Sequence, residues 1–98
     1  MAQFDVYRLA GGELALDIQT DLLGSFHSRI VVPLIPVADA PTRHKWLNPE
    51  FEIDRRRYAM VTQFMISLDR HELGTPIDNL DRCYDQIKLA YDMAFNGF

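Results

Sequence analysis

The first indication of the fold is the stretch Ile30-Val31-Val32-Pro33-Leu34-Ile35-Pro36, the longest apolar run in this 98-residue chain. Its β-branched residues follow one another without a polar interruption, which is typical of a strand covered on both faces. Pro33 has no N–H group, so we expect the strand to bulge, to end or to lie at a sheet edge there. The run is much shorter than the ~20 residues that a membrane-spanning helix needs. It predicts an interior strand of a soluble β-rich domain.

Shorter runs with a period of two surround that strand. Residues 4–9 and 14–18 flank Gly11-Gly12, which favours a tight hairpin because glycine readily adopts positive φ. Residues 36–49 predict a meandering connection with Trp46-Leu47 as its apolar anchor. Further along, alternating apolar residues predict a meander of short antiparallel strands. These residues are Phe51/Ile53, Tyr58/Met60 and Phe64/Ile66/Leu68.

The period changes after residue 76. From about residue 78 to residue 95 the apolar positions follow the spacing i, i+3, i+4, i+7, which predicts an amphipathic helix. Asp78 or Asn79 is placed to cap its start, and Gly97 lies where a helix commonly ends. The inward stripe consists of Leu80, Cys83, Tyr84, Ile87, Ala90, Tyr91 and Ala94. The sequence therefore predicts a single domain over residues 1–98, mainly β with one C-terminal helix.

A second apolar stripe lies on the opposite side of this helix. Leu89 and Met93 are four residues apart, so they share a face that one sheet cannot cover. One interpretation is that a loop covers the stripe or that it is simply exposed. The other is that it forms the contact of a homodimer.

Composition excludes several classes of protein. The net charge is −4, with 14 acidic against 10 basic residues, which argues against nucleic acid as the main partner. The lone Cys83 rules out an intramolecular disulfide and fits a reducing compartment, and its place on the inward stripe predicts a buried, unreactive thiol. The first five residues lack the basic and apolar regions of a signal peptide. We therefore expect a cytoplasmic protein.

No pattern indicates catalysis, a metal or a cofactor. His27, His44 and His71 are scattered without ligand spacing, so we expect no metal site. Asp21, Ser25, His27 and Ser28 include the residue types of a hydrolytic triad, but they crowd into one loop without a nucleophile motif. We expect no catalytic residues and no cofactor.

Arg55-Arg56-Arg57 is the one basic cluster of the sequence, and it is flanked by Glu50, Glu52 and Asp54. These acids favour a solvated turn tied by cross-strand pairs. The alternative is a clamp for phosphate or carboxylate, since arginine binds both with two parallel hydrogen bonds.

The order of these segments resembles the CcdB family of toxins. The similar segments are Phe4-x-Val6-Tyr7, Leu16-Asp17-Ile18-Gln19-Thr20-Asp21-Leu22-Leu23, Arg29-Ile30-Val31-Val32-Pro33-Leu34, Leu47-Asn48-Pro49 with Phe51-Glu52-Ile53, and the ending Ala94-Phe95-Asn96-Gly97-Phe98. The resemblance runs the whole length of the chain without large gaps. It implies an SH3-like barrel of antiparallel sheets, one extended and one smaller, with the C-terminal helix packed over them, as in CcdB and MazF.

The resemblance also implies a function. Such a protein is the toxin of a type II toxin–antitoxin system used in plasmid maintenance, and it is not an enzyme. It is a homodimer that binds the gyrase A subunit and poisons DNA gyrase, a topoisomerase II. A CcdA-like antitoxin neutralises it with a flexible C-terminal segment, and the pair represses its own operon. DNA is then contacted only through the antitoxin complex, and no membrane is involved.

The resemblance assigns gyrase binding to two places in this sequence. Leu22 and Leu23 match an apolar pair in the family's loop, and Gly97 and Phe98 match the end of its tail. Asp92 stands where the family has an asparagine in the same patch. Asn96 stands where the family has a tryptophan that stacks in the gyrase interface. The dimer contact falls on Leu89 and Met93.

Two other functions remain open from the sequence. One is an endoribonuclease of the MazF/Kid type, with the Arg55-Arg56-Arg57 cluster as clamp and Thr62 or Ser67 assisting. The other is a non-toxic CcdB relative that only binds antitoxin, which the asparagine at position 96 favours.

Overall fold

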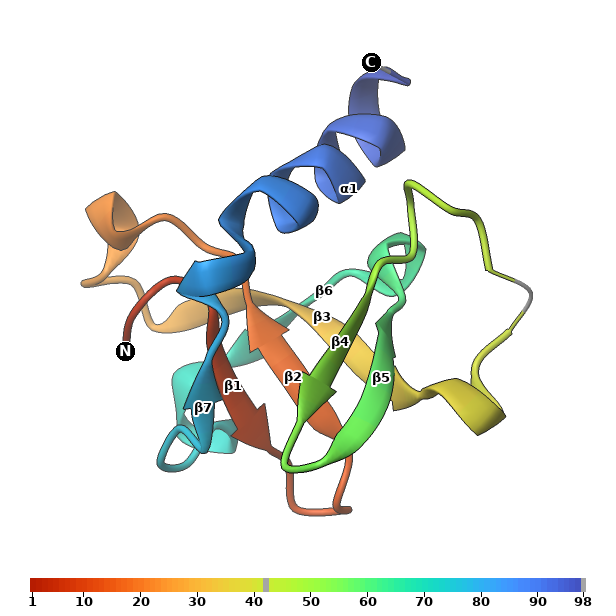
Figure 1. Cartoon of the computed structure of the whole chain (residues 1–98). Helices are drawn as coiled ribbons and strands as arrows, with labels where there is room; N and C mark the ends of the chain where they lie inside the picture. Colours follow the sequence, from red (N-terminus) through yellow and green to blue (C-terminus); the bar gives the residue numbers. More distant parts are fainter. Residues whose placement is uncertain (42, 98) are drawn as a thin grey trace.

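The computed structural model describes residues 1–41 and 43–97, and within them seven strands form one antiparallel sheet. The sheet curls into a nearly closed barrel, and helix α1 (Tyr84–Asn96) lies across one end of it (Figure 1). This confirms the predicted mainly-β barrel with a C-terminal helix. The strands are β1 (Asp5–Arg8), β2 (Leu14–Asp17), β3 (Ser28–Pro36), β4 (Glu50–Ile53), β5 (Arg56–Met60), β6 (Ile66–Asp69) and β7 (Asp78–Asn79).

Strand β3 is the centre of the sheet, whose order is β4-β5-β3-β2-β1-β7. β3 pairs with β2 along one edge and with β6 and then β5 along the other. Val32 and Leu34 belong to the main core, whereas Val31 belongs to a second core on the opposite face. The prediction of a strand covered on both faces is confirmed. Because β3 joins all its neighbours, the strands form one continuous sheet instead of the two that the resemblance implied.

β3 continues through Pro33 to Pro36, so the strand does not end there; on the side of its N atom Pro33 has no paired strand residue, as at a sheet edge. A strand residue points its N and its O to the same side, and the O of Pro33 accepts a hydrogen bond from the N–H of Val61 at 3.0 Å. The missing N–H therefore faces away from β2. On that side of β3 the pairing with β6 ends at Val31, and the pairing with β5 begins at Leu34. The N atom of Pro33 lies in the interval between these two partner strands. No ladder hydrogen bond is lost, because the interruption lies in the partner strands.

Both predicted tight connections are present. Gly12 between β1 and β2 has φ +94°, the left-handed conformation that a Cβ disfavours. Asp54 and Arg55 connect β4 to β5 with φ of +52° and +69°, as a two-residue hairpin turn requires. The third alternating set is not a single strand, because Phe64 lies in a short 3-10 turn, η3 (Thr62–Phe64), ahead of β6.

The predicted start of the C-terminal helix is wrong by six residues. The O of Val6 accepts from the N of Ile77, and the O of Phe4 accepts from the N of Leu80, so this segment is held extended against β1. A 3-10 turn, η5 (Asp81–Cys83), follows; its N-cap residue is Leu80, which makes no side-chain cap, and Oδ1 of Asn79 accepts the N–H of Asp81 just ahead of it. The end is as expected: Gly97 has φ +62° and donates to the O of Met93.

Cys83 is half-buried, so the prediction of a fully buried thiol is wrong. It belongs to the 3-10 turn that precedes α1 and packs at the margin of the main core. Its predicted lack of reactivity remains a prediction.

An ion pair is enclosed between β2 and β3. The side chains of Asp17 and Arg29 have no exposed surface, and Nε and Nη2 of Arg29 lie 2.8 and 2.7 Å from the same Oδ2 of Asp17. Among the described residues neither Nη1 nor Nη2 of Arg29 has a hydrogen-bond partner, so Nη2 contributes an ion-pair contact and Nε the hydrogen bond. Burial raises the pKa of Asp17, while the N–H of Gln19 and the Arg29 guanidinium act in the opposite direction. The pair is strong but incompletely satisfied, so each charge depends on the other.

We expect Arg29→Met to lower the free energy of unfolding by about 3–5 kcal/mol, because it leaves the Asp17 carboxylate buried without a counter-charge. The double variant Asp17→Leu/Arg29→Met should lose much less, since no lone charge remains. Urea unfolding of the two variants and the wild type measures this. A double variant less stable than Arg29→Met would contradict the account.

Because the hydroxyl of Tyr7 is buried, we expect the fold to lose stability at alkaline pH. The ring of Tyr7 is fully buried and its hydroxyl donates to Asp5 Oδ2 at 3.3 Å. Burial, together with the charges of Asp5 and Asp17, raises the pKa of Tyr7 to about 12. The unfolded chain releases this proton near pH 10, so Tyr7 stabilises the fold below that pH and its contribution is lost as the pH rises towards 12. We expect Tyr7 to lower the free energy of unfolding by about 2–3 kcal/mol between pH 9 and pH 12. Urea unfolding over this pH range measures the loss. The variant Tyr7→Phe, which has no hydroxyl to titrate, should not show it.

Candidate functional site

The segment after β2 forms a turn that carries Leu22 and Leu23. It contains the 3-10 turn η1 (Asp21–Leu23), and Gln19 is its main internal support. Nε2 of Gln19 donates to the O of Leu23 at 3.0 Å, and Oε1 of Gln19 accepts from the N of Ile30 at 3.1 Å. Gln19 is buried, and these two hydrogen bonds attach the turn to β3. Sequence reasoning used Gln19 only as part of a motif and missed this role.

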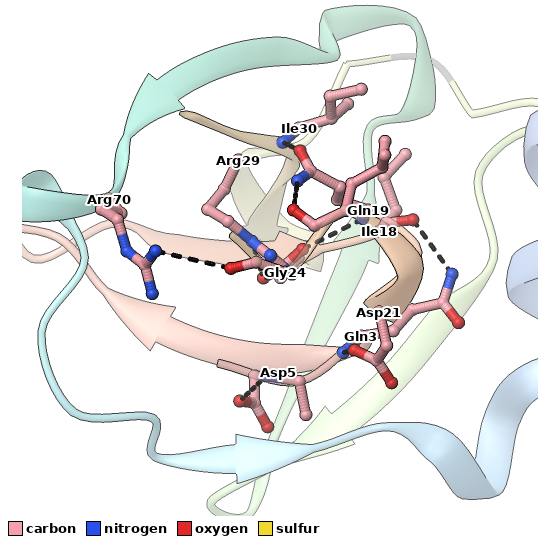
Figure 2. A network of polar contacts seen from close by, with 12 residues as sticks. Gln3, Asp5, Ile18, Gln19, Asp21, Gly24, Arg29, Ile30 and Arg70 are labelled. Atoms are coloured by element: carbon pink, nitrogen blue, oxygen red, sulfur yellow. Dashed lines mark hydrogen bonds and ion pairs between the residues drawn. The ribbon is translucent and has the colours of Figure 1, made fainter. Parts of the chain in front are cut away.

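Other polar contacts hold both ends of the turn. Oδ1 of Asp21 accepts from the N of Gln3 at 2.8 Å, which attaches the turn to the N-terminal segment. Nη1 of Arg70 donates to the carbonyl oxygens of Gly24 and Phe26 at 3.4 and 3.3 Å. Figure 2 shows the Arg70 guanidinium pointing towards Gly24. The turn is therefore fixed to three separate segments of the barrel.

Leu22 and Leu23 differ in exposure. Leu22 is 91% exposed, whereas Leu23 is half-buried. An apolar side chain held outwards on a fixed turn loses little conformational freedom when a partner covers it. Leu22 is therefore well placed for a binding contact, with Leu23 as its support.

The second part of the predicted site is the end of α1. Asp92 is half-buried, and Asn96 and Gly97 are exposed. Phe95, which the sequence interpretation did not single out, is 70% exposed. Phe98 lies outside the described residues.

One chain does not bring the two parts together. In Figure 1, η1 (orange) lies on the side where α1 begins, and Asn96 lies at the far end of the helix. A helix of 13 residues is about 20 Å long. Leu22 and Asn96 therefore form two separate surfaces in a single protomer.

The stripe of Leu89 and Met93 faces the protein's own residues 43–49. Met93 lines a cavity of about 600 Å³ together with His44, Leu47 and Met65, and Leu89 lines a neighbouring cavity of about 530 Å³. Both side chains are half-buried. This supports the interpretation of a stripe covered by a loop, and the dimer contact remains a prediction.

The anchor of residues 43–49 is Asn48, not Trp46-Leu47 as expected. Asn48 is buried, its amide donates to the O of Met60 at 3.1 Å and to Oε1 of Gln63 at 2.8 Å, and its oxygen accepts from the N of His44. Trp46 is 44% exposed. Backbone N–H and C=O groups in a connection of this kind need hydrogen-bond partners when they are buried, and the side chain of Asn48 supplies them.

The arginine cluster forms a solvated turn. Arg55 and Arg56 are exposed, and Nη2 of Arg57 lies 3.6 Å from Oε1 of Glu50 across the hairpin. Thr62 lies beyond the opposite end of β5, about 20 Å away for an extended chain. Its hydroxyl is buried and donates to the O of Leu47. Thr62 is therefore not placed to assist the arginine cluster, and the exposed Ser67 on β6 is the other hydroxyl of the ribonuclease alternative.

The described part of the chain also contains no cluster of three or more His, Cys, Asp or Glu side chains suited to a metal ion. The residue types of the hydrolytic triad do not form a chain of hydrogen bonds there, because Asp21 instead accepts from the backbone of Gln3. Among residues 1–41 and 43–97, no helix has the length and apolar character to cross a membrane.

A scan against protein-family models matched residues 3–97 to the model described as CcdB protein. The chain belongs to the CcdB family. A search of curated proteins found no match. The family match confirms the resemblance and covers both parts of the site, Leu22–Leu23 and the end of α1. This CcdB-family chain is accordingly a toxin of a toxin–antitoxin system.

Proposed function

We propose that this CcdB-family protein binds the A subunit of DNA gyrase and poisons the enzyme by trapping its cleaved-DNA complex. The observation that carries the proposal is the exposed Leu22 on its fixed turn, in a chain that matches the CcdB model from residue 3 to residue 97. Leu23, Asp92, Asn96, Gly97 and Phe98 complete the proposed contact. The protein acts by binding and has no catalytic role of its own. Because gyrase acts in the cytoplasm, the proposal places the toxin there.

The proposal includes a homodimer. A two-fold axis uses the same patch on both copies. A contact that includes Met93, in the last turn of α1, would therefore place the two C-terminal ends near each other and join their surfaces into one. Phe95 at 70% exposure and Phe64 at 51% are apolar side chains that a second copy could cover. We place Met93 in this contact and Leu89 at its rim, because Met93 lines the same cavity as the exposed Phe95, whereas Leu89 lines the neighbouring cavity.

We expect Met93→Asp to convert the homodimer to a monomer, since an unpaired carboxylate would be buried at the contact. Size-exclusion chromatography with light scattering at tens of micromolar measures this. Thr75→Asp, which adds the same charge at an exposed position ahead of β7, is the matched control and should remain dimeric. A wild-type protein that is monomeric at this concentration would contradict the dimer.

Asn96 weakens the proposed gyrase contact. A tryptophan buried at an interface typically contributes about 2–4 kcal/mol, and an amide buried without partners loses hydrogen bonds to water. Gly97 still permits close approach of the backbone, and Phe98 still supplies an aromatic ring. We infer a tail with the shape of the gyrase contact but without its strongest anchor.

We expect Asn96→Trp to strengthen binding to a bacterial gyrase A domain by about tenfold or more, because each tenfold corresponds to about 1.4 kcal/mol. Calorimetry or surface plasmon resonance compares the two proteins. Asp85→Trp, at an exposed position near the start of α1, controls for a nonspecific gain from an added indole. Equal binding by the wild type and Asn96→Trp, or binding by neither, would remove the tail from the gyrase contact.

We further propose that a CcdA-like antitoxin neutralises the toxin and that the two together repress their operon. With a net charge of −4, the toxin alone is a poor ligand for DNA, so operator binding falls to the complex. Such a pair would maintain a plasmid. A gel-shift assay with operator DNA, with each protein alone and with both, tests the division of roles.

Induced expression in a bacterium separates the proposal from its alternatives. Growth arrest with DNA breaks supports gyrase poisoning, and replacing all three residues Arg55, Arg56 and Arg57 by Gln should leave it largely intact. Cleavage of RNA by the purified protein without metal would instead indicate a ribonuclease. Absence of growth arrest would indicate a relative that only binds antitoxin.

A further inference from the structure

A basic groove lies between residues 43–49 and helix α1, away from Leu22 and Asn96. It is a cavity of about 530 Å³, and its main walls are Arg43, Lys45, Trp46, Glu50, Arg57 and Leu89. The proposed gyrase contact uses neither the groove's charged residues nor its tryptophan.

The groove has the opposite charge to the protein as a whole. Three cationic side chains, Arg43, Lys45 and Arg57, face one carboxylate, Glu50, although the chain carries a net −4. The carboxylate is shared: Arg43 Nε lies 3.0 Å from Oε2 and Arg57 Nη2 lies 3.6 Å from Oε1. A guanidinium has five N–H donors, so both arginines keep donors for a second anion. The groove therefore carries a local excess of positive charge on an acidic protein.

Apolar surface adjoins these charges. Trp46 is 44% exposed, and Nζ of Lys45 lies 4.8 Å from the centroid of its ring. Leu89, on α1, contributes to the groove from the other side. Tryptophan and arginine are the residue types most often found at the energetic centre of protein interfaces.

The groove is formed before any partner arrives. The buried amide of Asn48 joins residues 43–49 to β5 and to Gln63, and the Thr62 hydroxyl donates to the O of Leu47 at 2.6 Å. Nδ1 of His44 accepts the N–H groups of Trp46 and Leu47 at 3.2 and 3.3 Å. A surface braced in this way gives up little conformational entropy on binding.

We propose that the basic groove binds an acidic peptide segment of a partner protein. Its carboxylates pair with Arg43, Lys45 and Arg57, and an apolar side chain next to them packs between Trp46 and Leu89. The mixed lining favours peptide over nucleic acid, because a nucleic acid strand presents an unbroken row of phosphates, which Glu50 and the net charge of −4 disfavour. The surface is distinct from the proposed gyrase contact, so either proposal stands or fails without the other.

Trp46 is the only tryptophan of the chain, so its fluorescence reports binding directly. The full-length protein is titrated with three probes: an Asp/Glu-rich peptide containing one leucine, the same peptide with Asn/Gln for Asp/Glu, and a single-stranded DNA oligonucleotide of equal charge. We expect a saturable change in fluorescence with the acidic peptide, weakened by salt. The neutral peptide and the oligonucleotide should bind at least about fivefold more weakly.

The variants Lys45→Gln and Arg57→Gln locate the site. Each should weaken binding of the acidic peptide by about two- to fivefold at low salt, the range for one exposed charge pair. Arg8→Gln, which removes the same charge at an exposed position on the β1–β2 hairpin, should bind like the wild type. Equal binding of the neutral peptide, tighter binding of the oligonucleotide, no binding of any probe, or an equal loss in Arg8→Gln would each overturn the proposal.

Discussion

Asp17 and Arg29 lie fully enclosed between β2 and β3, and their contact determines which residues of the two strands face each other. Side chains alternate between the faces of a strand, so a slip of one residue would turn Arg29 from the second core into the main one and turn Val32 out of it. A charge moved into an apolar core without its partner is strongly unfavourable. The pair therefore favours the observed register over its neighbours.

The turn with Leu22 depends on that register. Asp17 ends β2 and also accepts the N–H of Gln19 through Oδ1, and Gln19 in turn bonds both to Ile30 and to the carbonyl of Leu23. A continuous series of hydrogen bonds therefore connects the buried ion pair to the turn that carries the exposed Leu22. A protein that binds a partner through Leu22 gains from this arrangement, because conformational freedom lost when a contact forms reduces the affinity.

The proposed binding surfaces differ in chemistry. Leu22 and Phe95 present exposed apolar side chains, whereas the groove of Arg43, Lys45 and Arg57 is cationic beside an exposed indole. On a chain with net charge −4, a local excess of positive charge steers acidic partners to one place and keeps long polyanions away. Different partners can thus meet different faces of a small barrel.

The sequence by itself determined the elements whose signal is local. The apolar run around Val31, the glycine pair at the first hairpin and the helical spacing from Ile87 to Ala90 depend on neighbours within a few residues, and they predicted strand, turn and helix. The resemblance likewise identified the family from consecutive residues such as Asp17 to Leu23. Tertiary structure decided what depends on distant partners. Residues 78–79 became a strand because β1 offers them hydrogen bonds, and Asn48 became an anchor because Met60 and Gln63 surround it. The groove exists only because α1 comes to lie beside residues 43–49, and no local pattern records which segments far apart in a chain will meet.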